Sequence, residues 1–427
     1  MPEVLFPNLM FEEELGLTAR SLPPKASRVV AELAPVMGFL ADSVGPCDED
    51  LSKKNIVVVS PNAVPGTVPA SLDHVIFKTL EELKRQDLDG YRFRPWGWSA
   101  TAIKAASELN IPSESVDLQI TKWINSRAFF ASFDHCHALV DEQMSKSERP
   151  GALCSELSQV TEALRAFSAV YGDSWVIKSN FSQAARNRLL GRGLSFDASQ
   201  LNWLHKRFDA LEPVYVEPWL QRLAECGLQF WVPPLKDHDQ SIRFEGACEM
   251  LTDDAGRYRG SVLNDHRENP WWTSAISHCQ TIAAQVAALG FHGPIGMDCM
   301  LFRHPSTGGP WLRPCHDING RFTMGRVALS LQKWLKPDEM GFWCHTSSKS
   351  VDERTILFAD LKLKNVRIVP TSPATIGTQP TNFQTVLLIS HNCESLIQVA
   401  RTILSQNIPG PFSGTGLPGE HRYHAPR

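Results

Sequence analysis

The sequence predicts a mixed α/β protein with more than one domain. Apolar runs of strand length, such as residues 56–59 and 175–177, alternate with longer segments of helical periodicity. The chain has 427 residues, whereas one domain usually takes roughly 100 to 200. Its composition, with 43% apolar and 21% charged residues, is that of an ordinary globular protein, which excludes collagen-like, coiled-coil and wholly disordered chains.

Charge and composition also narrow the class of partner. Lys and Arg number 42 against 46 Asp and Glu, so no overall basic field favours binding to nucleic acid or to a membrane, and we expect neither partner. The acidic N-terminus does not resemble a secretion signal, and no run of about 18 apolar residues predicts a transmembrane helix. Ten scattered cysteines without a Cys-x-x-Cys pair favour reduced thiols, so we expect a cytoplasmic protein.

The first 118 residues are predicted to form a small α/β domain. Residues 56–59 form an unbroken apolar run that predicts a buried strand, and a helix is expected over residues 72–85. Residues 91–94 alternate as in a second strand. Ser99 can cap a following helix over residues 100–109.

The middle of the chain shows a clearer alternation of strands and helices. Ser155 is expected to cap a helix that ends at Gly172. The elements predicted after it are a strand at 175–178, a helix at 198–211, a strand at 214–217 and an amphipathic helix at 276–289.

The last part of the chain is predicted to hold strands at 366–369 and 386–389 and a helix at 394–405, followed by a Gly/Pro-rich tail. The tail contains a literal G-x-G-x-x-G at 414–419, but no strand leads into it, so we reject a dinucleotide site. We also reject a metal site at His135-Cys136-His137, because adjacent side chains do not readily turn to one ion.

The most informative segment is residues 295–321, which is predicted to be a hairpin. A turn centred between residues 307 and 308 would bring Asp298 opposite Asp317 and Pro305 opposite Pro310. Period-two alternation puts Asn319 on the face of Asp317, so three oxygen ligands suited to Mg²⁺ would gather there. The alternative is a solvated surface hairpin. Met300 and Phe302, which are apolar and lie on the Asp298 face, argue against it.

An acid in a hydrophobic strand, followed across a hairpin by acid-x-Asn-x-Arg at 317–321, resembles the metal-binding end of the ATP-grasp superfamily. Segments at 125–127, 178–188 and 214–220 are similar to that family in order and spacing, and the resemblance covers residues 117–332. It implies an ATP-grasp fold, in which two α/β lobes grip ATP after a Rossmann-like small α/β domain.

The resemblance also implies a division of the chain and a set of site residues. The domains would be residues 1–118, an ATP-grasp module at 119–335, and a C-terminal α/β extension with a flexible tail at 336–427. Asp298, Asp317 and Asn319 would hold Mg²⁺, for which Mn²⁺ could substitute. The residues implied to bind ATP are Arg127, Lys178, Ser182, Arg186, Arg188, Glu217, Trp219, Leu220 and Met300.

Some residues depart from the family pattern. The phosphate loop, expected to be a mobile lid over residues 179–193, has no glycine between Ser179 and Leu190. Asp317 stands where the family more often has Glu, and Arg127 stands in place of a phosphate-facing Lys. These departures keep open the alternative of a nucleotide-binding protein without turnover.

The family's usual chemistry implies an ATP-dependent ligase that joins a carboxylate to an amine through an acyl phosphate. Lys178 and Arg321 would be catalytic, with Arg321 holding the substrate carboxylate and Arg326 a weaker candidate for that role. A salt bridge from Arg321 to Asp317 is the structural alternative. A phosphotransferase on the same fold is the alternative enzyme. We expect small-molecule carboxylate and amine substrates, and a homodimer is left open.

Overall fold

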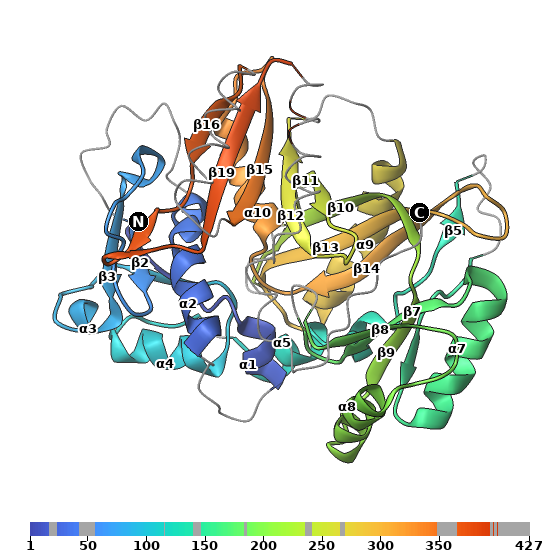
Figure 1. Ribbon diagram of the computed structural model, residues 1–427. Coiled ribbons are helices and arrows are strands. Elements are labelled where there is room, and N and C mark those ends of the chain that lie inside the picture. Colours follow the sequence, from blue (N-terminus) through green and yellow to red (C-terminus); the bar gives the residue numbers. More distant parts are fainter. Residues whose placement is uncertain are drawn as a thin grey trace.

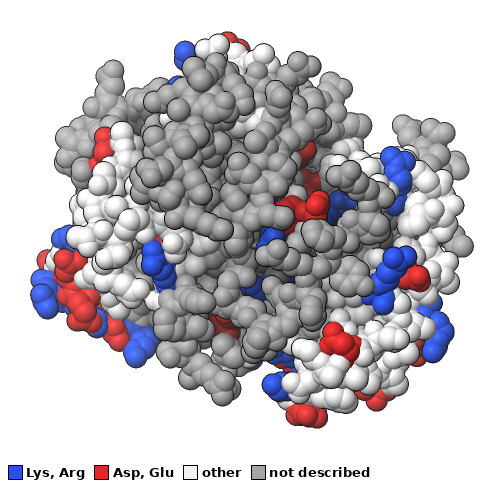
Figure 2. Space-filling model, in the orientation of Figure 1, with Lys and Arg blue, Asp and Glu red and all other residues white. Residues whose placement is uncertain are grey.

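Three β-sheets of four or more strands, with the helices that cover them, make up the described part of the chain (Figure 1). The computed structural model describes residues 1–16, 24–41, 56–114, 116–139, 147–182, 186–234, 241–264, 270–347, 365–392, 396 and 399. Among the helices described there, none has the length and apolar character needed to span a lipid bilayer. Acidic and basic side chains of the described residues are intermixed on the face shown in Figure 2.

The first sheet is parallel and has the order β3-β2-β1-β4. Its strands are β1 (Glu3–Phe6), β2 (Ile56–Ser60), β3 (Val75–Thr79) and β4 (Arg92–Pro95). Ile56 and Val58 of β2 pack with α2 (Pro24–Leu33) and the 3-10 helix η1 (Ala34–Leu40), whereas Val57 and Val59 pack with α4 (Ala100–Glu108). Because both faces of the sheet are buried, β2 is a continuous apolar run, as predicted.

One expectation for this part of the chain is confirmed and another is wrong. Ser99 caps α4, because its hydroxyl accepts a hydrogen bond from the Ala102 N–H. The helix predicted over residues 72–85 is wrong, because that segment holds the 3-10 helix η2 (Ala70–Leu72), strand β3 and the short helix α3 (Leu80–Leu83). Parallel pairing of β3 with β2 outweighs the local periodicity.

The second sheet is antiparallel and has the order β6-β9-β7-β8. Its elements are β6 (Ala152–Cys154), β7 (Ser174–Ser179), β8 (Arg188–Arg192), β9 (Val214–Pro218), α7 (Leu157–Tyr171) and α8 (Ala198–Asp209). Gly172 follows α7 at a φ of +88°, as glycine tolerates, but the N-cap of α7 is Glu156 and not Ser155. The predicted loop 179–193 is shorter than expected, because residues 188–192 form β8.

The third sheet has nine strands in the order β16-β19-β15-β12-β11-β10-β13-β14-β5, and all its neighbours are antiparallel. The strands are β5 (His137–Ala138), β10 (Gln221–Val232), β11 (Arg243–Thr252), β12 (Tyr258–Leu263), β13 (Gly293–Arg303), β14 (Pro310–Asn319), β15 (Met340–Ser347), β16 (Arg367–Pro370) and β19 (Phe383–Ser390). Helix α9 (Pro270–Ala288) packs on β10, β13 and β14, and α10 (Met324–Leu331) packs on β10, β11 and β12.

The remaining elements are short. They are α1 (Phe11–Gly16), α5 (Leu118–Ile124), α6 (Arg127–Phe130), the 3-10 helix η3 (Gln332–Trp334), β17 (Thr375–Ile376) and β18 (Gln379–Pro380). Strands β16 and β19 confirm the two predicted C-terminal strands, whereas β15 was not predicted. All three extend the sheet that contains β13 and β14, so the sheet runs on past residue 335, and the domain boundary there stays a prediction. Of the predicted helix at 394–405, only residues 396 and 399 are described, and the tail with residues 414–419 lies outside the described residues.

The hairpin of β13 and β14 positions the candidate site. Asp298 pairs with Asp317 and Gly296 with Asn319, as predicted. Beyond Asp298 the register shifts by two residues, so Pro310 pairs with Arg303 and the predicted pairing of Pro305 with Pro310 is wrong. The extra residues lie on β14 around Pro314, which has no N–H to donate to the ladder and therefore favours an interruption.

Candidate active site

Asp298 and Asp317 lie opposite each other where β13 and β14 form the candidate metal site. Burial, together with the neighbouring carboxylates of Asp317 and Glu225, raises the pKa of Asp298 to about 8, although Arg321 and Lys178 act in the opposite direction. A carboxyl group with this pKa is largely protonated at neutral pH. A divalent cation bound between the two side chains would favour the ionised form of both, since it would replace their mutual repulsion with attraction to the cation.

The third candidate ligand, Asn319, lies two residues beyond Asp317 on β14. Its Oδ1 accepts a hydrogen bond of 3.1 Å from Nη2 of Arg321. Within the described ranges, no group of three or more His, Cys, Asp or Glu side chains is arranged to hold a metal. The candidate set therefore depends on an amide oxygen in addition to the two carboxylates, a donor set that suits Mg²⁺.

Arg321 is paired with helix α1. Its Nε and Nη2 both contact Oε1 of Glu12 on α1, and its Nη1 donates to the Phe322 carbonyl at 2.8 Å. The structural alternative for Arg321 was a salt bridge to Asp317. The structure shows the ion pair with Glu12 instead. The arginine nevertheless influences the pKa of Asp298, so it lies close to the carboxylate pair.

Lys178 lies at the start of a chain of buried ion pairs. Its Nζ contacts Oε1 of Glu217, whose Oε2 lies 2.7 Å from Nη2 of Arg313. Arg313 in turn donates to both oxygens of Asp134, at 2.6 and 2.7 Å. Burial alone would raise the pKa of Glu217, but Lys178 and Arg313 lower it well below its usual range. Lys178 is thus held by Glu217, and it lies near enough to Asp298 to influence the pKa of that carboxyl group.

Arg127 connects the phosphate loop with the carboxylate pair. Its Nη1 donates to the Ser179 carbonyl and to Oγ of Ser182, both at 2.9 Å. Its Nη2 lies 3.5 Å from Oδ2 of Asp317. Arg127 and Ser182, two residues proposed from the sequence to contact ATP, therefore lie together, between Lys178's strand and β14.

Two arginines, Arg186 and Arg188, were expected in the phosphate loop. Arg188 begins β8, and both arginines have partners in other segments. Nη1 of Arg186 donates to Oε1 of Glu13 on α1 at 2.6 Å. Nη2 of Arg188 donates to the Ala255 carbonyl, and its guanidinium lies 5.6 Å from the ring centre of Trp219. Burial and the neighbouring Arg222 lower the pKa of Arg188 to about 10.

The residues expected at the adenine edge lie where β9 ends. Glu217 is the penultimate residue of β9, and the Trp219 N–H donates to the Ser174 carbonyl at 2.8 Å. Leu220 and Met300 are buried in one apolar cluster with Phe302. This arrangement brings backbone, an acid and apolar side chains together, which is what recognition of a base requires. The ATP-contacting roles of these residues remain predictions.

Sequence reasoning missed several charged residues of this region. Arg313 and Asp134 were not identified, although Arg313 lies on β14 at even spacing from Asp317. Glu225 and His316 were also missed. Burial and the charge of Arg313 lower the pKa of His316, and its Nε2 lies 3.8 Å from Oε1 of Glu225. A buried Arg in a strand next to a candidate metal ligand was the one signal that could have drawn attention to this cluster.

Comparisons with known proteins give structural matches. No protein-family model matches the sequence, and no curated protein matches it. N5-carboxyaminoimidazole synthetase from Staphylococcus aureus, complexed with ADP, has a TM-score of 0.51 at 11% identity, covering 94% of this chain and 97% of that one.

Two further solved structures contain biotin carboxylases. The biotin carboxylase domain of the Hydrogenobacter thermophilus 2-oxoglutarate carboxylase has a TM-score of 0.51 at 9% identity, covering 95% of this chain and 90% of its own. Biotin carboxylase from Campylobacter jejuni has a TM-score of 0.50 at 9% identity, covering 94% of this chain and 90% of its own. At such identities the likeness is one of fold, and it confirms the predicted fold class.

Proposed function

Because this chain has the ATP-grasp fold, we propose that it is an ATP-dependent ligase that joins a carboxylate to an amine through an acyl phosphate. The proposal depends on one observation above all. Asp298 and Asp317 face each other across β13 and β14, close enough to Lys178 for its charge to affect the pKa of Asp298. Two facing carboxyl groups with a neighbouring amide oxygen form a donor set that suits a divalent cation, and a bound cation would allow both carboxyl groups to ionise.

Asp298, Asp317 and Asn319 would hold Mg²⁺ or Mn²⁺. When bound, the cation would neutralise charge on the transferring phosphoryl group. The protein's own task is then to position the nucleotide. Lys178 and Arg127 would face its phosphates from the opposite side, while the end of β9 would hold the base.

Arg321 would hold the substrate carboxylate in two-point fashion and then stabilise the oxyanion formed when the amine attacks. In the structure this guanidinium is occupied by Glu12. Substrate binding would therefore exchange one carboxylate partner for another, which costs less than stripping water from a free guanidinium.

The structural neighbours support nucleotide and metal use. The Staphylococcus aureus protein is complexed with ADP, and the Hydrogenobacter thermophilus protein with MgADP and bicarbonate. By analogy of fold alone, this chain would bind ATP with Mg²⁺ in the same cleft.

The test is a screen for substrate-dependent ADP release. The full chain is incubated with ATP, Mg²⁺ and sets of amino acids and small peptides, with Asp317→Ala as the control. The proposal predicts ADP release that requires both a carboxylate and an amine and yields an amide and free phosphate. A stable phosphorylated acceptor would indicate the phosphotransferase instead, and nucleotide binding without any turnover would contradict the ligase.

A further inference from the structure

A cavity of about 210 Å³ lies outside the cluster around Lys178 and is lined by four arginines and one tryptophan. The lining residues are Arg92, Arg94, Trp231, Arg243 and Arg326. They come from β4 of the first sheet and from β10, β11 and α10 of the large sheet region. The cavity therefore lies between the first domain and the nucleotide-binding module, and none of the described residues that line it is acidic.

Carboxylates hold these arginines from positions outside the cavity lining. Nη2 of Arg92 lies 2.9 Å from Oε1 of Glu114, and Nη1 of Arg94 lies 2.7 Å from Oε1 of the buried Glu3. A guanidinium has five N–H donors, so the ion pair of Arg92 with Glu114 does not use all of them. The ion pairs fix the orientation of the two guanidinium groups.

Two of the arginines share a single carboxylate. Nη2 of Arg243 lies 3.0 Å from Oε1 of Glu245, and Nη1 of Arg326 lies 2.6 Å from Oε2 of the same group. This trio keeps a net positive charge on its side of the cavity. The Arg243 guanidinium also lies 5.9 Å from the ring centre of Trp231, which forms an aromatic wall.

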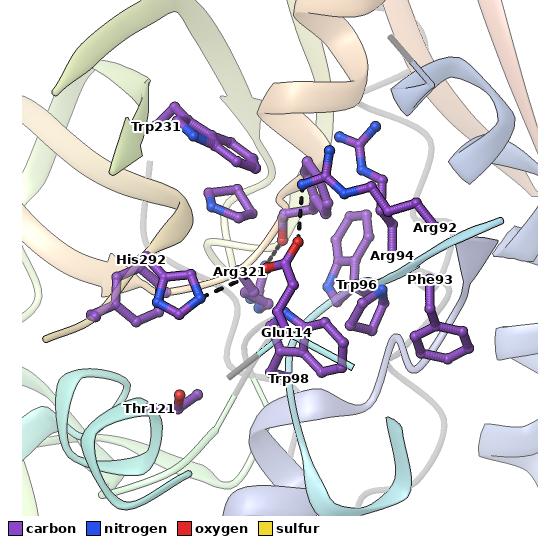
Figure 3. A pocket seen from close by; sticks show the side chains of 16 residues that line it. Arg92, Phe93, Arg94, Trp96, Trp98, Glu114, Thr121, Trp231, His292 and Arg321 are labelled. Carbon is purple, nitrogen blue, oxygen red and sulfur yellow. Dashed lines mark hydrogen bonds and ion pairs between the residues drawn. The ribbon is translucent and has the colours of Figure 1, made fainter. Parts of the chain in front are cut away.

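The arginine cavity shares lining residues with a second pocket that Arg321 also lines. A smaller pocket of about 30 Å³ shares Arg92, Arg94 and Trp231 with it and is also lined by Arg321. Figure 3 shows Arg92 and Arg94 on one side of this pocket, Trp231 across from them, and Arg321 between. A molecule anchored by the four arginines could thus extend toward the residue expected to hold the reacting carboxylate.

We propose that one substrate of this enzyme carries a phosphate monoester and that Arg92, Arg94, Arg243 and Arg326 bind it. The inference rests on the proposed ligase function. Guanidinium forks match the oxygens of a phosphate in bidentate fashion, and several of them favour a dianion over a single carboxylate. A cavity of about 210 Å³ is many times the roughly 10–15 Å³ that a single water needs, which leaves room for a phosphate group and the carbon that bears it.

The binding of inorganic phosphate to the full chain tests this inference. Calorimetric titration is performed at constant ionic strength, with Mg²⁺ and a non-hydrolysable ATP analogue present to fill the nucleotide site. Arg243→Ala and Arg326→Ala should each weaken phosphate binding about tenfold or more, since each removes a charge-assisted contact. Arg326→Lys should recover only part of the loss. Arg303→Ala, an exposed arginine on β13 outside the cavity, is the matched control and should bind phosphate as the wild type does.

Separate measurements distinguish this inference from the proposed function. Binding of the ATP analogue should be unchanged in Arg243→Ala and impaired in Lys178→Met. Binding of phosphate should be impaired in Arg243→Ala and unchanged in Lys178→Met. If nucleotide binding depends on Lys178 but phosphate binds equally well to both arginine variants, or does not bind at millimolar concentration, the inference is wrong and the ligase proposal stands. Tighter binding of succinate than of phosphate would also overturn it. If phosphate binding requires both arginines but no nucleotide binds, the ligase proposal fails instead.

Discussion

Glu12 on α1 and Arg321 beyond β14 form an ion pair that joins helix α1 to the candidate metal site. Both side chains are largely buried, with exposed fractions of 5% and 11%. The neighbouring Glu13 binds Arg186 in the same way. Two arginines that we expect to contact substrate and nucleotide are therefore positioned by one short acidic helix.

Glu12→Gln should destabilise the protein, because it leaves the Arg321 guanidinium buried with a weaker partner. We expect the free energy of unfolding to fall by about 3 kcal/mol, as for other buried pairs that lose one member. Urea denaturation measures this change. Glu81→Gln is the matched control, since Glu81 is exposed and pairs with Lys84 at the surface, and it should leave stability unchanged. An equal change in the free energy of unfolding in the two variants would show that the buried Glu12 pair stabilises the protein no more than the exposed Glu81 pair does.

Arg313→Met should be among the most destabilising substitutions in the chain. It would leave the buried carboxylates of Asp134 and Glu217 without their shared cation. The expected loss is about 3 to 5 kcal/mol of the free energy of unfolding. Chemical denaturation compares it with Arg303→Met, which lies at the exposed end of β13. A loss below about 1 kcal/mol would mean that the two acids are satisfied without Arg313.

Lys178→Met should weaken ATP binding by about tenfold or more, since it removes a charge-assisted contact to the phosphates. Glu217 keeps Arg313 as a partner, so the fold should survive the change. Binding of a fluorescent ATP analogue gives the affinity. Lys206→Met on the exposed face of α8 removes the same charge elsewhere and should have no effect. If Lys178→Met binds the ATP analogue as tightly as the wild type does, Lys178 does not contact the nucleotide.

His345 should make stability depend on pH. Burial, together with Arg259, lowers the pKa of this imidazole from 6.5 to about 4. Between these values the unfolded chain binds a proton that the folded protein does not, so stability is full above about pH 6.5 and falls as the pH decreases toward 4. The loss at about pH 5 relative to about pH 8 is ~2 kcal/mol for this residue.

His345→Phe isolates that contribution. Among the described residues neither ring nitrogen of His345 has a hydrogen-bond partner, so the aromatic replacement keeps the packing and removes the titration. The difference in urea midpoint between the two pH values should be smaller in the variant than in the wild type. Identical pH dependence in the two proteins would show that His345 does not titrate in this range.

Local patterns predicted much of the fold. The apolar run of β2 and the Ser99 cap each depend on neighbouring residues, and both are as predicted. The facing pair of Asp298 and Asp317 was also predictable, because strand alternation and a turn place them together. The register nearer the turn was not predictable in the same way, since the interruption at Pro314 changes the count along β14.

Contacts between distant segments could not be derived from the sequence. Glu12 and Arg321 are 309 positions apart, and no local pattern associates them. The arginine cavity likewise gathers residues from four elements, each of which alone resembles an ordinary surface strand or helix. Strand β3 was mistaken for a helix because its parallel pairing with β2 is a tertiary effect.

The central claim is that Asp298 and Asp317, through a divalent cation, hold a nucleotide opposite Lys178. Its most direct test is the affinity of a fluorescent ATP analogue as a function of Mg²⁺ concentration, for the wild type, for Asp317→Asn and for Asp209→Asn, an exposed acid at the end of α8. We predict that Mg²⁺ tightens binding in the wild type and in Asp209→Asn, and that this enhancement falls by about tenfold or more in Asp317→Asn. The same Mg²⁺ dependence in all three proteins would contradict the claim.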